Sequence, residues 1–297
     1  MALYLREKVN PMRAPQPAIL ADLPRHARFL EFVRRAEADP TPVLRTLAAQ
    51  PWSSQAVLGL GVGLVAKLGA NVAGLRAFPA LSGPGVSIPS TQMDVWIWLG
   101  GEDQGRIVHD SRAVTQALSP AFHRVGMVEG FKFDRGLDLT GYEDGTENPT
   151  GEAAIAAAIS EGDSFVAVQQ WEHDLTHFAS LSALERDHVI GRSLADNAEL
   201  EDAPPSAHVK RAAQEDYSPE AFMVRRSMPW ADASGEGLMF VAFGHSFDAF
   251  ESVLSRMSGQ DDGIVDGLFR FSRPRSGSYF WCPPVRKGCL DLNALGM

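Results

Sequence analysis

The order of expected strands and helices is the feature that most constrains the fold of this chain. Residues 93–99, Met-Asp-Val-Trp-Ile-Trp-Leu, are dense in β-branched and aromatic residues and predict a strand. A helix with apolar residues at helical spacing is expected at 106–118, and a second strand at 123–133. The elements before them are expected to be a strand, a helix, a strand and a short helical turn, at residues 27–34, 41–49, 55–60 and 63–68, although a helix over 27–34 also fits. If the turn at 63–68 is counted as a connection, the order is strand, helix, strand, strand, helix, strand. This is the split β-α-β pattern of a ferredoxin-like unit.

The same pattern partly recurs in the second half of the chain. Residues 164–171 predict a strand and residues 174–192 contain a helix; further on, a strand, a helix and a strand are expected at 237–243, 247–257 and 278–282. The polar segment 193–229 has no assigned element, and long irregular segments inside compact domains are usually functional or disordered. We therefore expect an α+β chain of two tandem ferredoxin-like units, an N-terminal unit at 1–140 and a C-terminal unit at 141–297.

Charge and composition exclude several classes of protein. The net charge of −10 over 297 residues argues against non-specific binding to nucleic acid. Two cysteines, Cys282 and Cys289, are too few for a disulfide framework and fit a reducing compartment. The first ten residues lack the apolar core of a signal peptide, and the longest apolar stretch, 56–68, is interrupted by glycines and Lys67 and is too short to span a bilayer. We expect a cytoplasmic protein that does not contact membranes.

The loop at residues 141–149, Gly-Tyr-Glu-Asp-Gly-Thr-Glu-Asn-Pro, places two acidic side chains between glycines. Glycine allows a positive φ or a close backbone approach, and the threonine, asparagine and proline that follow indicate a turn. Asp144 is thus expected on a tight loop, with Gly145 leaving one side of it open. Taken alone, these residues describe an acidic surface turn.

Two later stretches change this interpretation. A single histidine, His208, lies in the polar segment, and the run Arg225-Arg226-Ser227-Met228-Pro229 follows. With the loop around Asp144, and in this order, they resemble the dye-decolourising peroxidases, haem enzymes whose signature is a glycine–x–x–aspartate–glycine loop. The resemblance covers nearly the whole chain and includes residues 91–95, 171–175, 189–192, 206–208, 224–229 and 268–271. It implies that two ferredoxin-like halves join into a dimeric α+β barrel-like domain, with haem b in the C-terminal half.

The resemblance also implies roles for individual residues. His208 matches the proximal histidine that binds the haem iron, and a peroxidase needs an open position on the other face of the haem. Asp144 matches the distal acid, which would move a proton between the two peroxide oxygens. Arg225 matches the distal arginine, which would stabilise the charge on the departing oxygen. Arg225 is chosen over Arg226 because the family's arginine precedes a small polar residue by two positions, here Ser227.

Further residues are assigned to the haem site. Arg192 resembles the arginine that binds a haem propionate, and Asp266 is expected to accept a hydrogen bond from the second nitrogen of the proximal histidine. Leu238 and Phe240 share one face of a strand and would line the distal pocket, although plain core packing fits them equally. The others are Glu147 and Asn148 near the haem edge and Ser227, which could bond a haem-bound water or a propionate.

A second pair of histidines has a spacing that can hold zinc. His173 and His177 are four residues apart where a helix is expected to start. No third ligand or catalytic glutamate accompanies them, so a solvated helix face is the expected environment.

The function expected from the resemblance is that of a haem-dependent peroxidase, in the intracellular subgroup with short insertions. Hydrogen peroxide would oxidise the haem to a ferryl species, which two one-electron steps from dyes or other reducing substrates would return to the ferric state. Bulky dyes would deliver electrons through aromatic residues, with Trp171, Tyr142, Trp230 and Trp281 as candidates. The sheet edges of this fold favour a homo-oligomer, and the short end of the chain, 289–297, does not suggest packaging in an encapsulin shell.

Two other classes of function remain open from the sequence. The same fold occurs in relatives that bind haem or porphyrin for transport or iron handling, in which His208 would hold haem while Asp144 and Arg225 would matter little. A dimeric α+β barrel without haem, acting as a binding or assembly module, is the third. A Soret band separates the last from the others, and peroxide turnover separates the first two.

Overall fold

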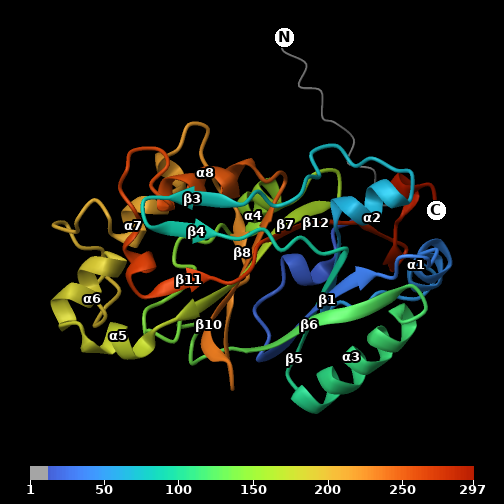
Figure 1. Ribbon diagram of the computed structural model, residues 1–297, viewed down its shortest axis with the longest axis horizontal. Coiled ribbons are helices and arrows are strands. Elements are labelled where there is room, and N and C mark those ends of the chain that lie inside the picture. Colours follow the sequence, from blue (N-terminus) through green and yellow to red (C-terminus); the bar gives the residue numbers. More distant parts are fainter. Residues whose placement is uncertain (1–12) are drawn as a thin grey trace, which may run out of the picture.

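A closed antiparallel β-barrel organises residues 13–297, the part of the chain that this computed structural model describes (Figure 1). The barrel strands are β1 (His26–Arg34), β2 (Ala56–Leu60), β5 (Val95–Gly101), β6 (Phe122–Phe131), β7 (Ser164–His173), β9 (Met228–Asp232), β10 (Gly235–Gly244) and β12 (Ser278–Cys282). They hydrogen-bond in the order β7-β12-β2-β5-β1-β6-β9-β10, and β10 pairs back with β7. Two short strands, β8 (Val224–Arg225) and β11 (Ser272–Pro274), add to β10 and β7.

Helices surround the barrel and cluster at its two ends. They are α1 (Thr41–Ala48), α2 (Val62–Lys67), α3 (Gln104–Leu118), α4 (Gly151–Ala158), α5 (Leu175–Ser180), α6 (Ala183–Ile190), α7 (His208–Arg211) and α8 (Asp248–Met257). In Figure 1, α5 and α6 lie at the left-hand end of the molecule and α1 to α3 at the right-hand end. Small hairpins are formed by β3 (Leu81–Gly83) with β4 (Val86–Ile88) and by β13 (Val285–Arg286) with β14 (Cys289–Leu290). The expected α+β class is confirmed.

Most of the expected elements form, with ends displaced by a few residues. The segment at 27–34 is a strand, so the helical alternative for it is wrong. The unassigned segment 193–229 contains α7, β8 and the start of β9, and α4 was not expected at all. The two halves of the barrel meet at narrow seams, because β2 and β12 pair only at Leu60 and Trp281, and β6 and β9 only at Gly130 and Trp230.

Side chains that alternate along the barrel strands divide the hydrophobic core into two layers. Met239, Val241 and Phe243 of β10 belong to a buried cluster to which every barrel strand except β6 contributes, whereas Leu238 and Phe240 pack against another. This alternation follows from the two-residue period of a strand. The inner cluster is rich in large aromatic side chains, namely Phe29, Trp96, Trp98, Trp230, Phe243 and Phe280. The barrel interior is therefore filled by side chains.

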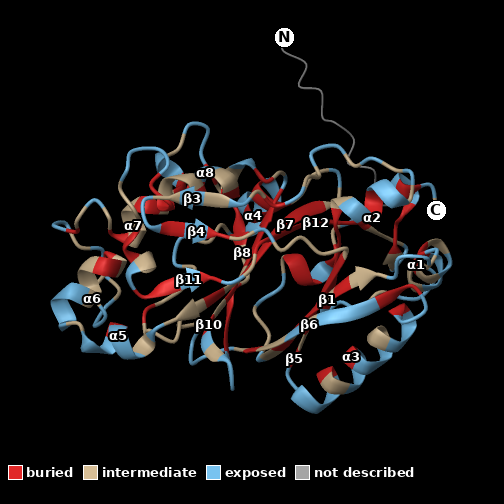
Figure 2. Ribbon diagram, viewed as in Figure 1, coloured by how far each residue is buried: buried red, intermediate tan, exposed pale blue. Residues whose placement is uncertain are grey.

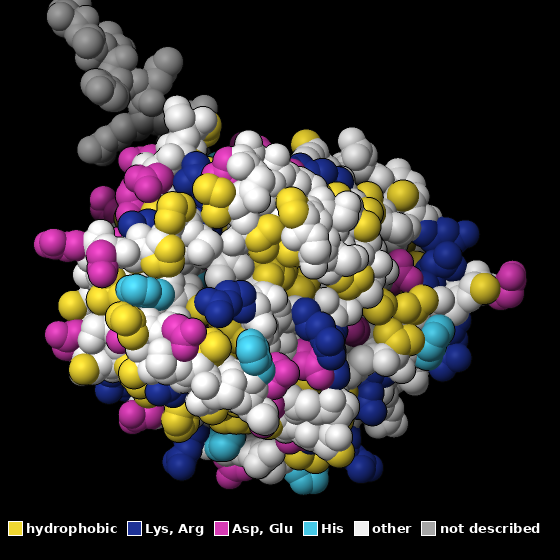
Figure 3. Space-filling model, turned by 60° about the vertical axis from the view of Figure 1, so that its left-hand side comes forward, with side chains coloured by type: hydrophobic (Ala, Val, Ile, Leu, Met, Phe, Trp, Pro, Cys, Tyr) yellow, Lys and Arg dark blue, Asp and Glu magenta, His cyan; other side chains and the backbone are white. Residues whose placement is uncertain are grey.

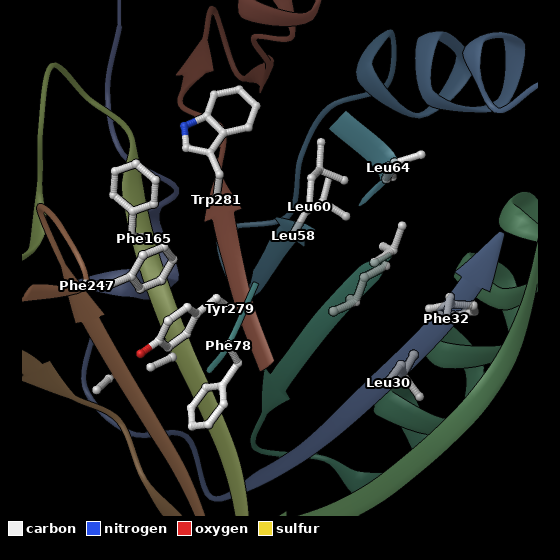
Figure 4. Packing of buried hydrophobic residues seen from close by; sticks show 14 of the residues in the cluster. Leu30, Phe32, Leu58, Leu60, Leu64, Phe78, Phe165, Phe247, Tyr279 and Trp281 are labelled. Carbon is white, nitrogen blue, oxygen red and sulfur yellow. The ribbon is translucent and has the colours of Figure 1, made fainter. Parts of the chain in front are cut away.

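The outer layer packs helices against the barrel. Tyr279 of β12 stacks on Phe247 with ring centroids 3.9 Å apart, and Figure 4 shows Phe165 beside this pair. Figure 2 shows most barrel strands largely buried, whereas β6, α3, α5 and α6 expose much of their surface. Between α8 and the outer face of β7 and β10, this layer leaves a cavity.

The helices and the two cysteines were also subjects of the sequence analysis. No helix within residues 13–297 is long and apolar enough to cross a membrane. Cys282 is buried, Cys289 is half-buried, and both are free thiols.

Candidate active site

His208 opens the short helix α7 and is held by a buried carboxylate. Its Nδ1 lies 2.8 Å from Oδ2 of Asp266, whose residue is only 1% exposed. The other oxygen of Asp266 accepts a hydrogen bond from the Leu268 amide at 2.8 Å, as the N-cap of a 3₁₀ turn. An ionised carboxylate only accepts hydrogen bonds, so the imidazole proton is on Nδ1. This leaves the lone pair of Nε2 available to a metal.

Two glycines bring α7 and Asp266 together. Gly191 ends α6 with φ +94°, and a Cβ there would lie 2.2 Å from Cγ1 of Val209, so α7 packs directly on this backbone. The Gly267 amide donates to the Ser206 carbonyl at 2.6 Å, which ties the Asp266 turn to the residues just before α7. His208 and Asp266 are 58 residues apart in the chain, and these two backbone contacts hold them next to each other.

The cavity in front of His208 is mostly apolar. Its floor consists of alternate residues of β7 and β10, and α8 covers it; these residues are Gln169, Trp171, His173, Leu238, Phe240, Phe250, Val253, Leu254 and Met257. Atom-free space in the cavity and at its open mouth amounts to about 690 Å³. Leu238 and Phe240 therefore serve both as lining and as core packing.

Asp144 and Arg225 reach the same cavity from two different segments. The loop around Asp144 bends at Gly141 and Gly145, which have φ of +90° and +78°. Asn148 fastens the loop to β8: its Nδ2 donates to the Arg225 carbonyl at 2.8 Å, and its Oδ1 accepts from the Arg225 amide at 2.8 Å. Asn148 acts here as a clamp between the acid and the arginine.

The orientation of β8 separates Arg225 from Arg226. Arg225 pairs with Ala242 of β10, and residues paired across antiparallel strands point to the same face. Ala242 lies two residues from Phe240, so Arg225 faces the cavity, where its Nε has no hydrogen-bond partner within residues 13–297. Arg226 instead lines an adjoining recess, and burial lowers the pKa of its guanidinium.

Ser227 lies beside the main cavity, in a recess that adjoins it. Its buried hydroxyl, which has no partner among the described residues, lines the same adjoining recess as Arg226 and not the main cavity. Asp144 and Arg225 line both spaces.

Burial raises the pKa of Asp144 above its ordinary value, because the charged form loses hydration. Arg225 opposes this shift, whereas the neighbouring carboxylate of Asp138 adds to it. The Asp144 carboxyl therefore keeps its proton to a higher pH than an exposed aspartate does.

Arg192 lies at a recess that also contains Asp144, His208 and Arg225. Its Nη2 lies 3.0 Å from Oε1 of Glu147 and 3.5 Å from Oε2 of Glu199. An anionic group arriving at this recess would compete with two carboxylates for the guanidinium.

His173 is the residue of this cavity whose environment was wrongly expected. It lies at the end of β7 and not on a helix, and its side chain is only 7% exposed. Its Nδ1 lies 2.6 Å from Oγ of Ser272 and its Nε2 lies 3.2 Å from Oδ2 of Asp138. Although burial opposes ionisation of Asp138, the hydrogen bond with His173 lowers its pKa. His177 is exposed on α5, and no group of three or more ligating side chains within residues 13–297 is placed to hold a metal ion.

The alternation of β7 was the signal that could have located His173. Residues 169, 171 and 173 share one face of a strand, and Trp171 was already part of an expected strand. Asp138, which precedes the acidic loop by only a few residues, has no comparable signal in the sequence.

Comparisons with known proteins agree with this geometry. A family model described as "Dyp-type peroxidase, C-terminal" matches residues 135–287. A dye-decolorizing peroxidase of Mycobacterium tuberculosis is 32% identical over 224 residues, which cover 71% of this chain and 67% of the relative. One of Rhodococcus erythropolis is 31% identical over 243 residues, covering 77% and 71%.

Solved structures extend the likeness to the whole fold. A dye-decolorizing protein from V. cholerae superposes with a TM-score of 0.82 at 28% identity, covering 94% of this chain and 98% of that one. A variant of DypB from Rhodococcus jostii RHA1, in complex with heme, has a TM-score of 0.81 at 27% identity, covering 91% and 96%.

The barrel fold and these comparisons define the class of protein, a haem-dependent peroxidase. The chain belongs to the Dyp-type peroxidase family. Its cofactor is haem, and the residues present fit that group, since Nε2 of His208 is available and the cavity is apolar.

The first prediction concerns the iron ligand. Replacing His208 with alanine removes the side chain whose Nε2 is available to iron, so the His208→Ala protein should purify with little haem and lose its Soret band. The exposed His177→Ala variant is the matched control and should keep both. A His208→Ala protein with full haem content and an unchanged Soret band would show that another group binds the iron.

The second prediction concerns pH. Asp144 must be ionised to take a proton from peroxide, and its pKa is raised by burial. The rate of reaction with peroxide should therefore fall as the pH drops through this raised pKa, and the overall optimum should stay below neutral pH. Stopped-flow rates across pH should show this acid limb in the native protein and not in Asp144→Asn. An unchanged limb in Asp144→Asn, or an alkaline optimum, would contradict the assignment.

Proposed function

We propose that this peroxidase binds haem b through His208 and activates hydrogen peroxide with Asp144 and Arg225. One observation carries the proposal: a single apolar cavity contains a histidine with its Nδ1 bound to a carboxylate, a buried acid and an arginine. When bound, haem supplies an iron that reacts with peroxide and stores oxidising equivalents.

The division of work between Asp144 and Arg225 follows from their chemistry. Asp144 would take the proton from one peroxide oxygen and return it to the other, which leaves as water. Arg225 cannot act as the base, since its guanidinium stays protonated, but its fixed charge stabilises the departing oxygen. Asn148 would keep these two groups in register, because it binds the backbone of Arg225 while lying on the loop of Asp144.

Other residues would hold the cofactor. Arg192 is proposed to pair with a haem propionate, because it lines the recess beside His208. Glu147, which lines the same recess and pairs with Arg192, would then give up this ion pair or share the guanidinium with the propionate. Leu238 and Phe240 would contact the porphyrin face. Ser227 would act only through the adjoining recess.

Reducing substrates are proposed to be dyes and other one-electron donors. A covered, mostly apolar cavity has little room for a bulky dye beside haem, so such donors would be oxidised from the surface. A carrier of haem or porphyrin is the less favoured alternative, because it has no use for an acid and an arginine buried together.

The proposal extends to the organisation of the chain. Each half of the barrel has the strand order of a ferredoxin-like unit, β2-β5-β1-β6 in one half and β12-β7-β10-β9 in the other, and this supports units at 1–140 and 141–297. A homo-oligomer that works in the cytoplasm without an encapsulin shell is also part of the proposal.

The third prediction separates the two distal groups. Loss of a general acid–base typically costs roughly 10²–10⁴-fold in rate, and loss of an electrostatic stabiliser roughly 10²–10³-fold. Water can replace Asp144 as a proton carrier, whereas no other cation lines the cavity among the described residues. Arg225→Leu should therefore slow the reaction with peroxide more than Asp144→Ala, and the double mutant should not be additive.

Arg226→Leu is the matched control, because Arg226 is half-buried next to Arg225 but does not line the cavity. Its stopped-flow rate with peroxide should stay near that of the native protein. A large loss in Arg226→Leu with a near-normal Arg225→Leu would reverse the assignment.

A further inference from the structure

Tyr142 makes a hydrogen bond that the peroxide chemistry does not use. Its hydroxyl donates to Oδ1 of Asp187, which also accepts the Leu194 amide at 3.1 Å. Tyr142 is 5% exposed, and burial together with Asp187 raises the pKa of its phenol, so the group stays protonated. A protonated phenol facing a carboxylate can lose an electron and pass its proton on in the same event.

A continuous row of aromatic rings joins Tyr142 to the haem cavity. Tyr142 packs edge-on against Phe178 with centroids 6.2 Å apart, and Phe178 lies 4.4 Å from Phe271. Phe271 lies 5.5 Å from the ring of His173, which lines the cavity. The loop offers a second, shorter connection, since Tyr142 precedes Asp144 by two residues and their Cα atoms are at most about 7.6 Å apart.

The outer end of this row reaches the surface beside α6. Asp187 is half-buried, and Leu184, three residues before it on the same face of the helix, is 62% exposed. Leu194, whose amide binds Asp187, is 45% exposed, and its Cδ1 would lie 3.4 Å from a Cβ on Gly141, next to Tyr142. The face that carries α5 and α6 comes forward in Figure 3, where hydrophobic side chains lie among charged ones. Such a surface suits an aromatic molecule better than a small ion.

The other aromatic candidates lack one of these features. The indole of Trp171 donates to the amide oxygen of Gln169 at 3.2 Å and not to a carboxylate. The indole of Trp230 donates to the backbone carbonyl of Trp171 at 2.9 Å, and a carbonyl cannot take up a proton. The indole of Trp281 does face a carboxylate, that of Asp163, at 2.7 Å. However, no aromatic contact links Trp281 to the cavity within the described residues.

We infer that Tyr142, with Asp187 as its proton acceptor, is the residue at which phenols and aromatic amines are oxidised from the surface. This inference rests on the proposed peroxidase function. Tyr142 gives one electron to the haem that has reacted with peroxide, and its proton passes to Asp187. The tyrosyl radical then takes one electron from the aromatic donor, the proton returns from Asp187, and the donor leaves as its one-electron-oxidised radical. Two such cycles balance one peroxide.

The test is the radical itself. The haem-loaded protein is mixed with hydrogen peroxide without a reductant, frozen, and examined by electron paramagnetic resonance after growth on ring-deuterated tyrosine. A tyrosyl signal that narrows on deuteration should be present in the native protein and absent from Tyr142→Phe, which keeps the ring and its packing. Tyr217→Phe is the matched control and should keep the signal, because its hydroxyl donates to the Arg211 carbonyl and not to a carboxylate.

Asp187→Asn tests the proton acceptor. It should give a weaker radical signal at unchanged haem content, and turnover of a bulky phenolic dye should fall by roughly 10²-fold, as for loss of a positioned base. Tyr142→Phe, which has no hydroxyl to oxidise, should lose at least as much of this turnover. The stopped-flow rate with peroxide should stay near native in both. A tyrosyl signal or dye turnover that survives in Tyr142→Phe would overturn this inference and leave the peroxidase function intact. A native protein that does not react with peroxide would overturn both.

Discussion

The hydrogen bond between the buried carboxylate of Asp266 and Nδ1 of His208 is the interaction on which the rest of the site depends. It fixes the tautomer, leaves the other nitrogen without this partner in a side chain that lines the cavity, and couples the four-residue helix α7 to the turn before β11. A helix this short is not stable by itself. Its position comes from the Gly191 backbone on one side and the Gly267–Ser206 hydrogen bond on the other.

On the other side of the cavity, the residues around Asp144 determine the pKa of its buried carboxyl group. Placing Asp144 in an apolar cavity costs free energy, which Arg225 offsets only in part. Asp138 lies close enough to raise the pKa of Asp144, yet it is itself stabilised by His173. One buried acid with a raised pKa, beside another whose pKa is lowered, is a pattern typical of active sites. Asn148 holds Asp144 and Arg225 in a fixed arrangement, because the loop and β8 cannot move apart without breaking two hydrogen bonds.

Much of the fold could be predicted from the sequence, because strand and helix periods are local properties. The strand at Met-Asp-Val-Trp-Ile-Trp-Leu and its neighbours lie close to their expected places. Long-range contacts carry no such signal. Nothing local shows that Asp187 meets Tyr142, 45 residues earlier in the chain. The strand β9 was missed because Met228 and Pro229 follow an arginine pair that resembles a polar loop, and its pairing with β10 is a tertiary effect.

The central claim is that His208, made electron-rich by Asp266, is the iron ligand. Resonance Raman spectra of the ferrous haem protein report the iron–histidine stretching vibration, whose frequency rises with the donor strength of the imidazole. Asp266→Asn keeps the size of the side chain and weakens its hold on the Nδ1 proton, so the account predicts a lower frequency than in the native protein. A frequency that does not change in Asp266→Asn would contradict it.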